Sequence, residues 1–204
     1  MKAEHIEFLV EELSMEAALR LIVPRVIGEV SFEVYPFQCK DDLLGRLSQR
    51  LRGYAAWLPD NYRVVVVVDR DDDDCDALKE RLERDAESAG LATRSCPRGR
   101  VYQVVNRIAI EELEAWFFGD WDAVCEAYPR VNQRVPHKRG FRDPDAILGG
   151  TWEALERHLK RAGYFETGLR KVEAARSVAR CMQPSRNKSR SFQVFQHALT
   201  EMVS

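Results

Sequence analysis

The sequence lacks the features that mark a membrane-embedded or secreted protein. Its 204 residues contain no apolar run that approaches the roughly 20 residues needed to span a bilayer. Residues 1–5 lead directly into strand-like sequence and do not resemble a signal peptide. The five cysteines are odd in number and none has zinc-finger spacing, which predicts neither a disulfide framework nor a structural zinc. We therefore expect a cytoplasmic protein with reduced thiols and no membrane interaction.

Two further absences limit the classes of function that the sequence supports. The formal net charge is only −2, so no overall positive field attracts nucleic acid. Basic residues nevertheless gather in residues 130–142 and 176–190, which suits a phosphate-rich partner; two solvated surfaces explain them equally well. The chain has no Gly-x-x-x-x-Gly-Lys loop, which disfavours a nucleotide-binding phosphotransferase.

The most informative segment is a run of five valines that ends in acid. Residues 64–68 are all valine, and residues 69–74 contain five aspartates. An unbroken run of β-branched residues predicts a central parallel strand that is buried on both faces. Open α/β sheets bind their ligands at the carboxyl ends of such strands, so this acidic segment is a candidate site.

The rest of the chain alternates strand-like and helix-like segments, which predicts an α/β fold with a mainly parallel sheet and helices on both faces. We expect residues 1–120 to form this α/β domain and residues 121–204 to form an α-helical extension packed on the same core. Strands are predicted over residues 6–10, 31–37, 64–68, 91–95 and 101–105 and from residue 108, and helices over residues 14–27, 41–57, 75–89, 121–127, 151–162, 169–181 and 191–203.

Acidic residues follow three of the predicted strands. They are Glu11, the pair Asp69 and Asp71, and the pair Glu112 and Glu114. Because the carboxyl ends of parallel strands meet at one edge of a sheet, these carboxylates are expected to form one pocket. Such a pocket suits one or two Mg²⁺ or Mn²⁺ ions, which stabilise a pentavalent phosphate and activate water.

Each cluster also has a simpler interpretation. Asp69 and Asp71 point the same way only in an extended chain, and the alternative is a solvated acidic turn in which Asp74 caps the next helix. Glu11 alone is also consistent with a first-turn acid that favours the helix dipole.

Glu112 and Glu114 face one way only if the strand continues through them. If a helix has begun, only one of the two can enter the pocket, and we favour Glu114.

The motif Leu9-Val10-Glu11, a helix, and a valine strand ending in Asp69-x-Asp71 resembles the Toprim fold of topoisomerases, primases and OLD nucleases. That resemblance implies that Glu11 is a general acid/base or metal ligand and that Asp69 and Asp71 bind Mg²⁺. Toprim proteins usually have Gly after the first glutamate, where this chain has Glu12, and OLD-like nucleases tend to carry an acid where it has Met15.

Two further segments give a narrower resemblance. Residues 108–120, with Glu-Leu-Glu-Ala-Trp at 112–116, and residues 189–195 are similar to a small bacterial Toprim-like domain of unknown function, related to OLD-type nucleases. The resemblance implies that such proteins are often encoded beside an ABC-type ATPase in phage-defence settings.

The resulting expectation is a Mg²⁺-dependent phosphodiester hydrolase (nuclease) of the Toprim/OLD type, acting with an ABC-type ATPase in phage defence. Lys188 and Arg190 are candidate phosphate contacts; the alternative for them is a solvated helix start. Candidate partners are DNA or RNA, the ATPase and a second copy of the chain. The alternative function is a non-catalytic effector or regulatory subunit that binds an ATPase and retains a relic metal site.

Overall fold

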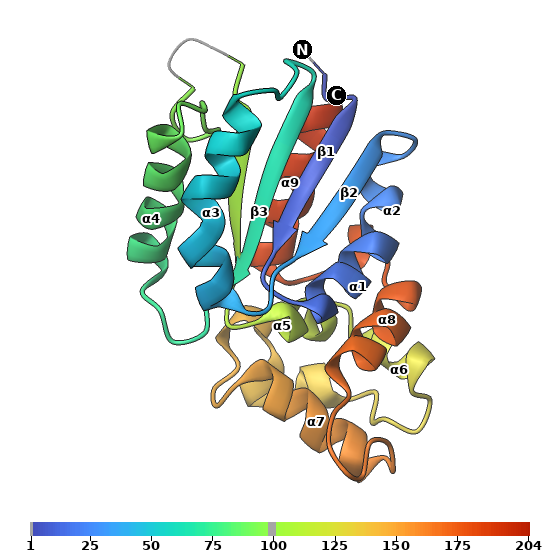
Figure 1. Ribbon diagram of the computed structural model, residues 1–204. Coiled ribbons are helices and arrows are strands. Elements are labelled where there is room, and N and C mark those ends of the chain that lie inside the picture. Colours follow the sequence, from blue (N-terminus) through green and yellow to red (C-terminus); the bar gives the residue numbers. More distant parts are fainter. Residues whose placement is uncertain (1, 98–100) are drawn as a thin grey trace.

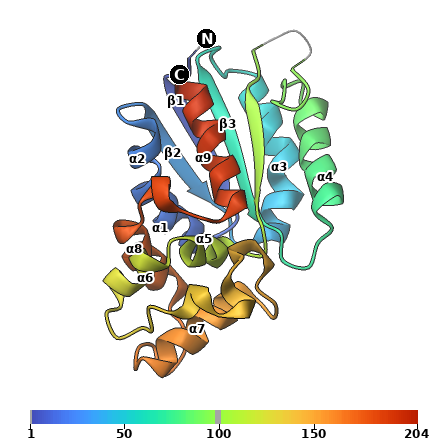
Figure 2. The same ribbon diagram turned by 180° about the vertical axis from the view of Figure 1, so that it is seen from behind.

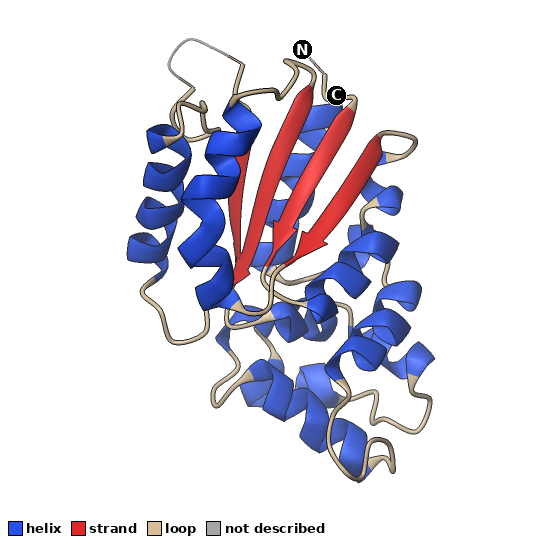
Figure 3. Ribbon diagram, in the orientation of Figure 1, coloured by secondary structure: helices blue, strands red, loops and turns tan. Residues whose placement is uncertain are grey.

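The chain forms an α/β fold around a four-stranded parallel sheet (Figures 1 and 3). The computed structural model describes residues 2–97 and 101–204. The strand order is β2-β1-β3-β4, with β1 (His5–Val10), β2 (Ser31–Pro36), β3 (Tyr62–Asp69) and β4 (Val104–Ala109). The α-helices of the described residues are α1 (Leu13–Ile22), α2 (Pro24–Ile27), α3 (Lys40–Ala55), α4 (Cys75–Ser88), α5 (Leu113–Gly119), α6 (Trp121–Ala127), α7 (Thr151–Arg161), α8 (Lys171–Cys181) and α9 (Arg190–Val203). Short 3-10 helices occur at Val135–His137, Arg139–Phe141, Pro144–Ala146 and Pro184–Arg186.

The valine run occupies the centre of the sheet, as its composition predicts. Its side chains alternate between two apolar clusters, because successive residues of a strand point to opposite faces. Val65 and Val67 join the larger cluster, and Val64, Val66 and Val68 join the smaller one. The strand is therefore buried on both faces.

Helices cover both faces of the sheet. Helices α3 and α4 lie on one face, and α1, α2 and α9 lie on the other (Figures 1 and 2). Helices α5 to α8 gather beyond the carboxyl edge, where they extend the larger apolar cluster; that cluster includes side chains from both residues 1–120 and residues 121–204. None of the helices in the described part of the chain is long and apolar enough to cross a membrane.

One predicted helix is interrupted, and one strand prediction is wrong. The helix predicted over residues 14–27 is divided, with α1 ending at Ile22 and α2 beginning at Pro24, as expected of a proline inside a helical segment. The segments predicted as strands at 101–105 and from 108 form one strand, β4, and residues 91–95 contribute only an isolated bridge at Thr93. The polar residues Asn106 and Arg107 lie inside β4 and concealed its continuity.

Candidate metal and catalytic site

The carboxyl ends of β1 and β3 bring Glu11 and Asp69 together. The two strands are neighbours, and Val10 pairs with Val67. The backbone N–H of Asp69 donates a hydrogen bond to Oε2 of Glu11 at 3.1 Å. Both side chains are buried, and Oδ1 of Asp69 accepts no hydrogen bond from the described residues. A buried carboxylate oxygen without a partner carries a desolvation cost, so this position requires an explanation.

A third buried carboxylate comes from α5. This helix begins soon after β4 ends and carries Glu114 in its first turn, where the residue is only 2% exposed. The negative charges of Glu11 and Glu114 both raise the pKa of Asp69. Three separate elements thus supply buried acids whose charges influence one another, and their convergence in one metal-binding pocket stays a prediction.

Burial is the main cause of the raised pKa values of these three carboxyl groups. It raises the pKa of Glu11 to about 7, opposed by the hydrogen bond from Asp69. It raises the pKa of Glu114 to about 8, opposed by the positive charge of Lys171. It also raises the pKa of Asp69 well above the ordinary value, with repulsion from Glu11 added. A carboxyl group that titrates near neutral pH is suited to general acid–base chemistry.

Asp71 lies in a different environment. Strand β3 ends at Asp69, and Asp71 adopts a left-handed backbone with φ 49°. Its side chain is 43% exposed and pairs with Lys40, with Nζ and Oδ2 2.5 Å apart. The premise that an extended chain aligns Asp71 with Asp69 is therefore wrong, because the strand stops between them. Its role as a metal ligand stays a prediction.

The acidic turn also caps a helix, as the simpler interpretation expects. Oδ1 of Asp74 accepts the backbone N–H of Ala77 at 2.8 Å and caps α4. The neighbouring loop after β4 holds Glu111 at φ 62°, and its carbonyl accepts the N–H of Asp71 at 2.8 Å. Two adjacent loops thus hold non-glycine residues in a left-handed conformation, a strain that tends to occur at functional sites.

Glu112 serves a different helix. Its Oε2 accepts hydrogen bonds from the N–H and hydroxyl of Thr151 and from the N–H of Trp152, each at 2.9 Å. These groups form the N-terminus of α7, so Glu112 caps that helix. Glu112 and Glu114 diverge because a helix has begun at Leu113, which is the second of the two predicted cases.

Two lysines at this edge were not predicted from the sequence. Lys40, at the start of α3, donates to the carbonyls of Asp69 and Arg70 at 3.2 and 3.0 Å. Burial opposes the charge of Lys171, at the start of α8, but Glu114, Glu12 and Glu112 outweigh it and raise its pKa. Lys40 follows β2 and was accessible to the same strand-end reasoning that found the acids. Lys171 is far away in sequence and gave no such signal.

The two departures from the Toprim pattern have plain structural outcomes. Glu12 has φ −150° and ψ 168°, an extended conformation that any residue adopts, so this backbone does not require glycine. Met15 is fully buried in the larger apolar cluster.

Lys188 and Arg190 are exposed and lie at the N-terminal end of α9, on the sheet face opposite α3. The N–H of Lys188 donates to the carbonyl of Gly119 at 2.9 Å, which holds this segment against the end of α5. Their contact with phosphate stays a prediction.

The donor set at the carboxyl edge fits a hard divalent cation. Asp69 and its neighbours offer carboxylate oxygens, the ligands that Mg²⁺ and Mn²⁺ prefer, and Asp69 Oδ1 has no competing hydrogen bond. Within residues 2–97 and 101–204, however, no three acidic, histidine or cysteine side chains are arranged so that they could hold one ion. Their side chains would have to rotate before three of them could bind the same ion.

The fold and the site define an α/β protein with buried, mutually repelling carboxylates at the carboxyl edge of a parallel sheet. The chain belongs to the DUF4276 family, described as a domain of unknown function, which it matches over residues 4–202. No curated protein and no solved structure shows significant similarity to it.

Proposed function

We propose that this protein is a metal-dependent phosphodiester hydrolase of the Toprim/OLD type. The observation that carries the proposal is the buried Asp69, which has one oxygen without a hydrogen bond and whose pKa is raised by burial and by the charges of two other buried acids, Glu11 and Glu114. An oxygen that no donor occupies is available to a cation. A divalent cation would neutralise the repulsion among these acids.

In this proposal Asp69 and Glu114 would hold the cation, and Asp71 would join them if its ion pair with Lys40 opened. The cation would be Mg²⁺ or Mn²⁺, which supplies charge stabilisation at phosphate. Glu11, with a pKa of about 7, accepts a proton from the attacking water. Lys171 contributes positive charge where the phosphate becomes more negative.

Nucleic acid as the substrate is supported by the resemblance of the β1 and β3 motifs to Toprim domains. The same resemblance supports an ABC-type ATPase partner and a role in phage defence. A DNA or RNA substrate is consistent with the basic stretch that contains Lys188 and Arg190.

The decisive experiment incubates the purified protein and Mn²⁺ with labelled DNA and RNA, with and without a candidate ABC-type ATPase. Cleavage should require metal and should fall on the order of 100-fold or more in Asp69→Asn, because a ligand is lost. Asp72→Asn is the matched control, since Asp72 is an exposed acid of the same turn. Cleavage that persists in Asp69→Asn would contradict the proposal and indicate a contaminating nuclease.

A second candidate is a non-catalytic subunit, and one observation favours it. The described residues contain no three metal-binding side chains that converge. This candidate expects no cleavage with any metal, and a complex with the ATPase that survives Asp69→Asn.

A further inference from the structure

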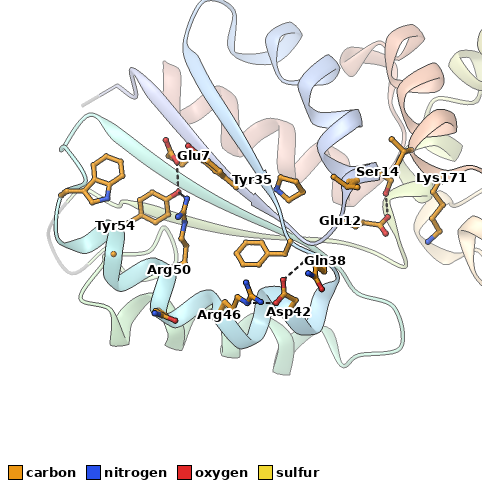
Figure 4. A pocket seen from close by; sticks show the side chains of 17 residues that line it. Glu7, Glu12, Ser14, Tyr35, Gln38, Asp42, Arg46, Arg50, Tyr54 and Lys171 are labelled. Atoms are coloured by element: carbon orange, nitrogen blue, oxygen red, sulfur yellow. Dashed lines mark hydrogen bonds and ion pairs between the residues drawn. The ribbon is translucent and has the colours of Figure 1, made fainter.

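A long groove runs beside the sheet on the face that carries α3. It encloses about 1220 Å³ and lies between α3 and the first two strands, with Tyr54 toward one end and Glu12 and Lys171 at the other (Figure 4). The groove exists because α3 covers β3 and does not extend over the edge strand β2 (Figure 1). Glu33 and Tyr35 of β2 are consequently exposed on this face.

Aromatic rings line this groove and are partly open to solvent. Trp57 is 56% exposed and Tyr35 is 36% exposed. Trp57 is held in place by Tyr54 and Tyr62, whose ring centroids lie 5.6 and 6.4 Å away. Fixed, accessible ring faces are platforms on which nucleobases stack.

Two arginines and one aspartate of α3 line the same wall. The guanidinium of Arg50 is stacked 4.9 Å from the ring centre of Tyr35 and donates a hydrogen bond to the hydroxyl of Tyr54 at 3.2 Å. Arg46 is one turn earlier; it pairs with Asp42 at 2.7 Å, and its side chain is 66% exposed. Guanidinium groups interleaved with aromatic rings suit a phosphate backbone whose bases stack beside it.

One end of the groove lies beside the carboxyl end of β1. Glu12 and Lys171 line this end, and Glu12 directly follows Glu11 in the chain. A chain bound along the aromatic wall would thus extend toward the carboxyl end of β1.

We propose that this groove binds single-stranded nucleic acid, with bases on Trp57 and Tyr35 and phosphates on Arg46 and Arg50. The proposal rests on the proposed function, since it defines the substrate class of that hydrolase. Unpaired bases are specified because the faces of paired bases are covered inside a duplex and cannot reach these rings.

One glycine in α3 is consistent with a ligand that binds in the groove. Gly53 is inside the helix, where glycine is less stable than alanine, and a Cβ built there contacts no protein atom within 4 Å. It lines the groove, so its missing side chain leaves space for a bound chain. Gly45 lies in the same helix with equal free space, but outside the groove, which makes the two a matched pair.

The test measures the anisotropy of fluorescein-labelled oligonucleotides, as single strands of DNA and RNA and as the DNA duplex, in EDTA so that no cleavage occurs. Single strands should bind more tightly than the duplex. Trp57→Ala should weaken binding about 10-fold, the effect of one lost stacking contact, and Trp57→Phe should restore most of it. Arg46→Ala should lower the slope of log affinity against log salt by about 0.7, whereas Arg52→Ala, on α3 but outside the groove, should not.

The glycine pair keeps the proposal testable if Trp57→Ala fails to fold. Both Gly45→Ala and Gly53→Ala should raise the melting temperature slightly, and only Gly53→Ala should weaken binding. Equal binding by all these variants, or equal affinity for duplex and single strands, would contradict the proposal that the groove binds single-stranded nucleic acid.

The two proposals fail separately. Asp69→Asn should keep the preference for single strands over the duplex in EDTA, and that preference should still depend on Trp57. Groove-dependent binding without cleavage under any metal overturns the hydrolase alone. Two results together would contradict the groove proposal alone. Cleavage would be unchanged in Trp57→Ala and Gly53→Ala, and binding would be lost only in Lys188→Ala or Arg190→Ala, which lie on the opposite face.

Discussion

Glu7 and Asp69 are buried carboxylates on neighbouring strands with opposite surroundings. Each is 5% exposed. Glu7 lies in the middle of β1, where Oε2 accepts the hydroxyl of Tyr54 at 2.7 Å and Oε1 lies 2.8 Å from Nε2 of His5. Asp69 lies at the carboxyl end of β3, where Oδ1 has no partner among the described residues and other acids are its neighbours.

The difference shows where this fold tolerates an energetic cost. Two polar partners satisfy Glu7, which is what a buried acid requires when its role is structural. The region around Asp69 lacks that compensation, and its acids repel each other. An uncompensated site that the rest of the fold must stabilise is a candidate for function.

The largest effect should separate the two glutamates that follow β4. Glu114→Gln removes a proposed metal ligand, so metal-dependent cleavage should fall on the order of 100-fold. Glu112→Ala removes the cap of α7 and should cost about 0.5–2 kcal/mol of stability while leaving cleavage within a few-fold. Cleavage assays below the melting temperature, together with thermal melts, measure both; the reverse pattern would place Glu112 in the site.

The next effect is a pH dependence of the metal-free protein. Glu11 and Glu114 have pKa values of about 7 and about 8 in the folded state, above the ordinary 4.5. Between pH 4.5 and 8 the unfolded chain binds fewer of these protons than the folded chain, so stability should fall as pH rises through this range. Each pKa unit corresponds to about 1.4 kcal/mol, so melting temperatures in EDTA should drop by several degrees between pH 5 and 8.5.

This decline has an internal control. Asp69→Asn should lessen the decline without abolishing it, because the raised pKa of Asp69 no longer contributes while burial still raises the pKa values of Glu11 and Glu114. Added Mn²⁺ should oppose the decline in the wild type. A profile for the wild type that is flat from pH 5 to 8.5 would show that these acids are compensated after all.

A smaller effect is expected for the satisfied acid. Glu7→Gln places an amide where Tyr54 and His5 both meet a carboxylate, so one buried contact is lost. Unfolding in urea should show a loss of about 1–3 kcal/mol. Equal or greater stability of this variant would remove the contrast with Asp69, since neither acid would then be held by its partners.

The smallest effect should come from Asp71. Asp71→Asn keeps a residue that tolerates the left-handed backbone and loses only a half-exposed ion pair with Lys40. Its stability should change by about 1 kcal/mol or less in the same urea titration. A larger loss would indicate that the Lys40 pair is as important as the buried partners of Glu7.

Much of the framework was predictable because it follows from local patterns. The valine run predicts a strand buried on both faces, and the acids that follow three strands must meet if those strands are parallel. This reasoning locates Glu11, Asp69 and Glu114 without any tertiary information. The family match does not test the narrower Toprim relationship, which stays part of the proposed function.

The remainder depends on where each strand stops and what packs beyond it. The extended conformation ends at Asp69, and Asp71 is already left-handed. No residue type in the run of aspartates predicts that change. Glu112 finds its partners at Thr151 and Trp152, which are about 40 positions further along the chain. Lys171 likewise reaches the acids only through the packing of α8 against α1 (Figure 1).

The cap that Glu112 forms on α7 also links two parts of the molecule mechanically. Three hydrogen bonds fasten this side chain to the first turn of α7, and only Leu113 separates Glu112 from Glu114. A displacement of α7 cannot leave Glu114 in place unless those bonds break or the short backbone segment between them deforms. The position of α7 and the position of Glu114 are therefore coupled through three hydrogen bonds and one residue of backbone.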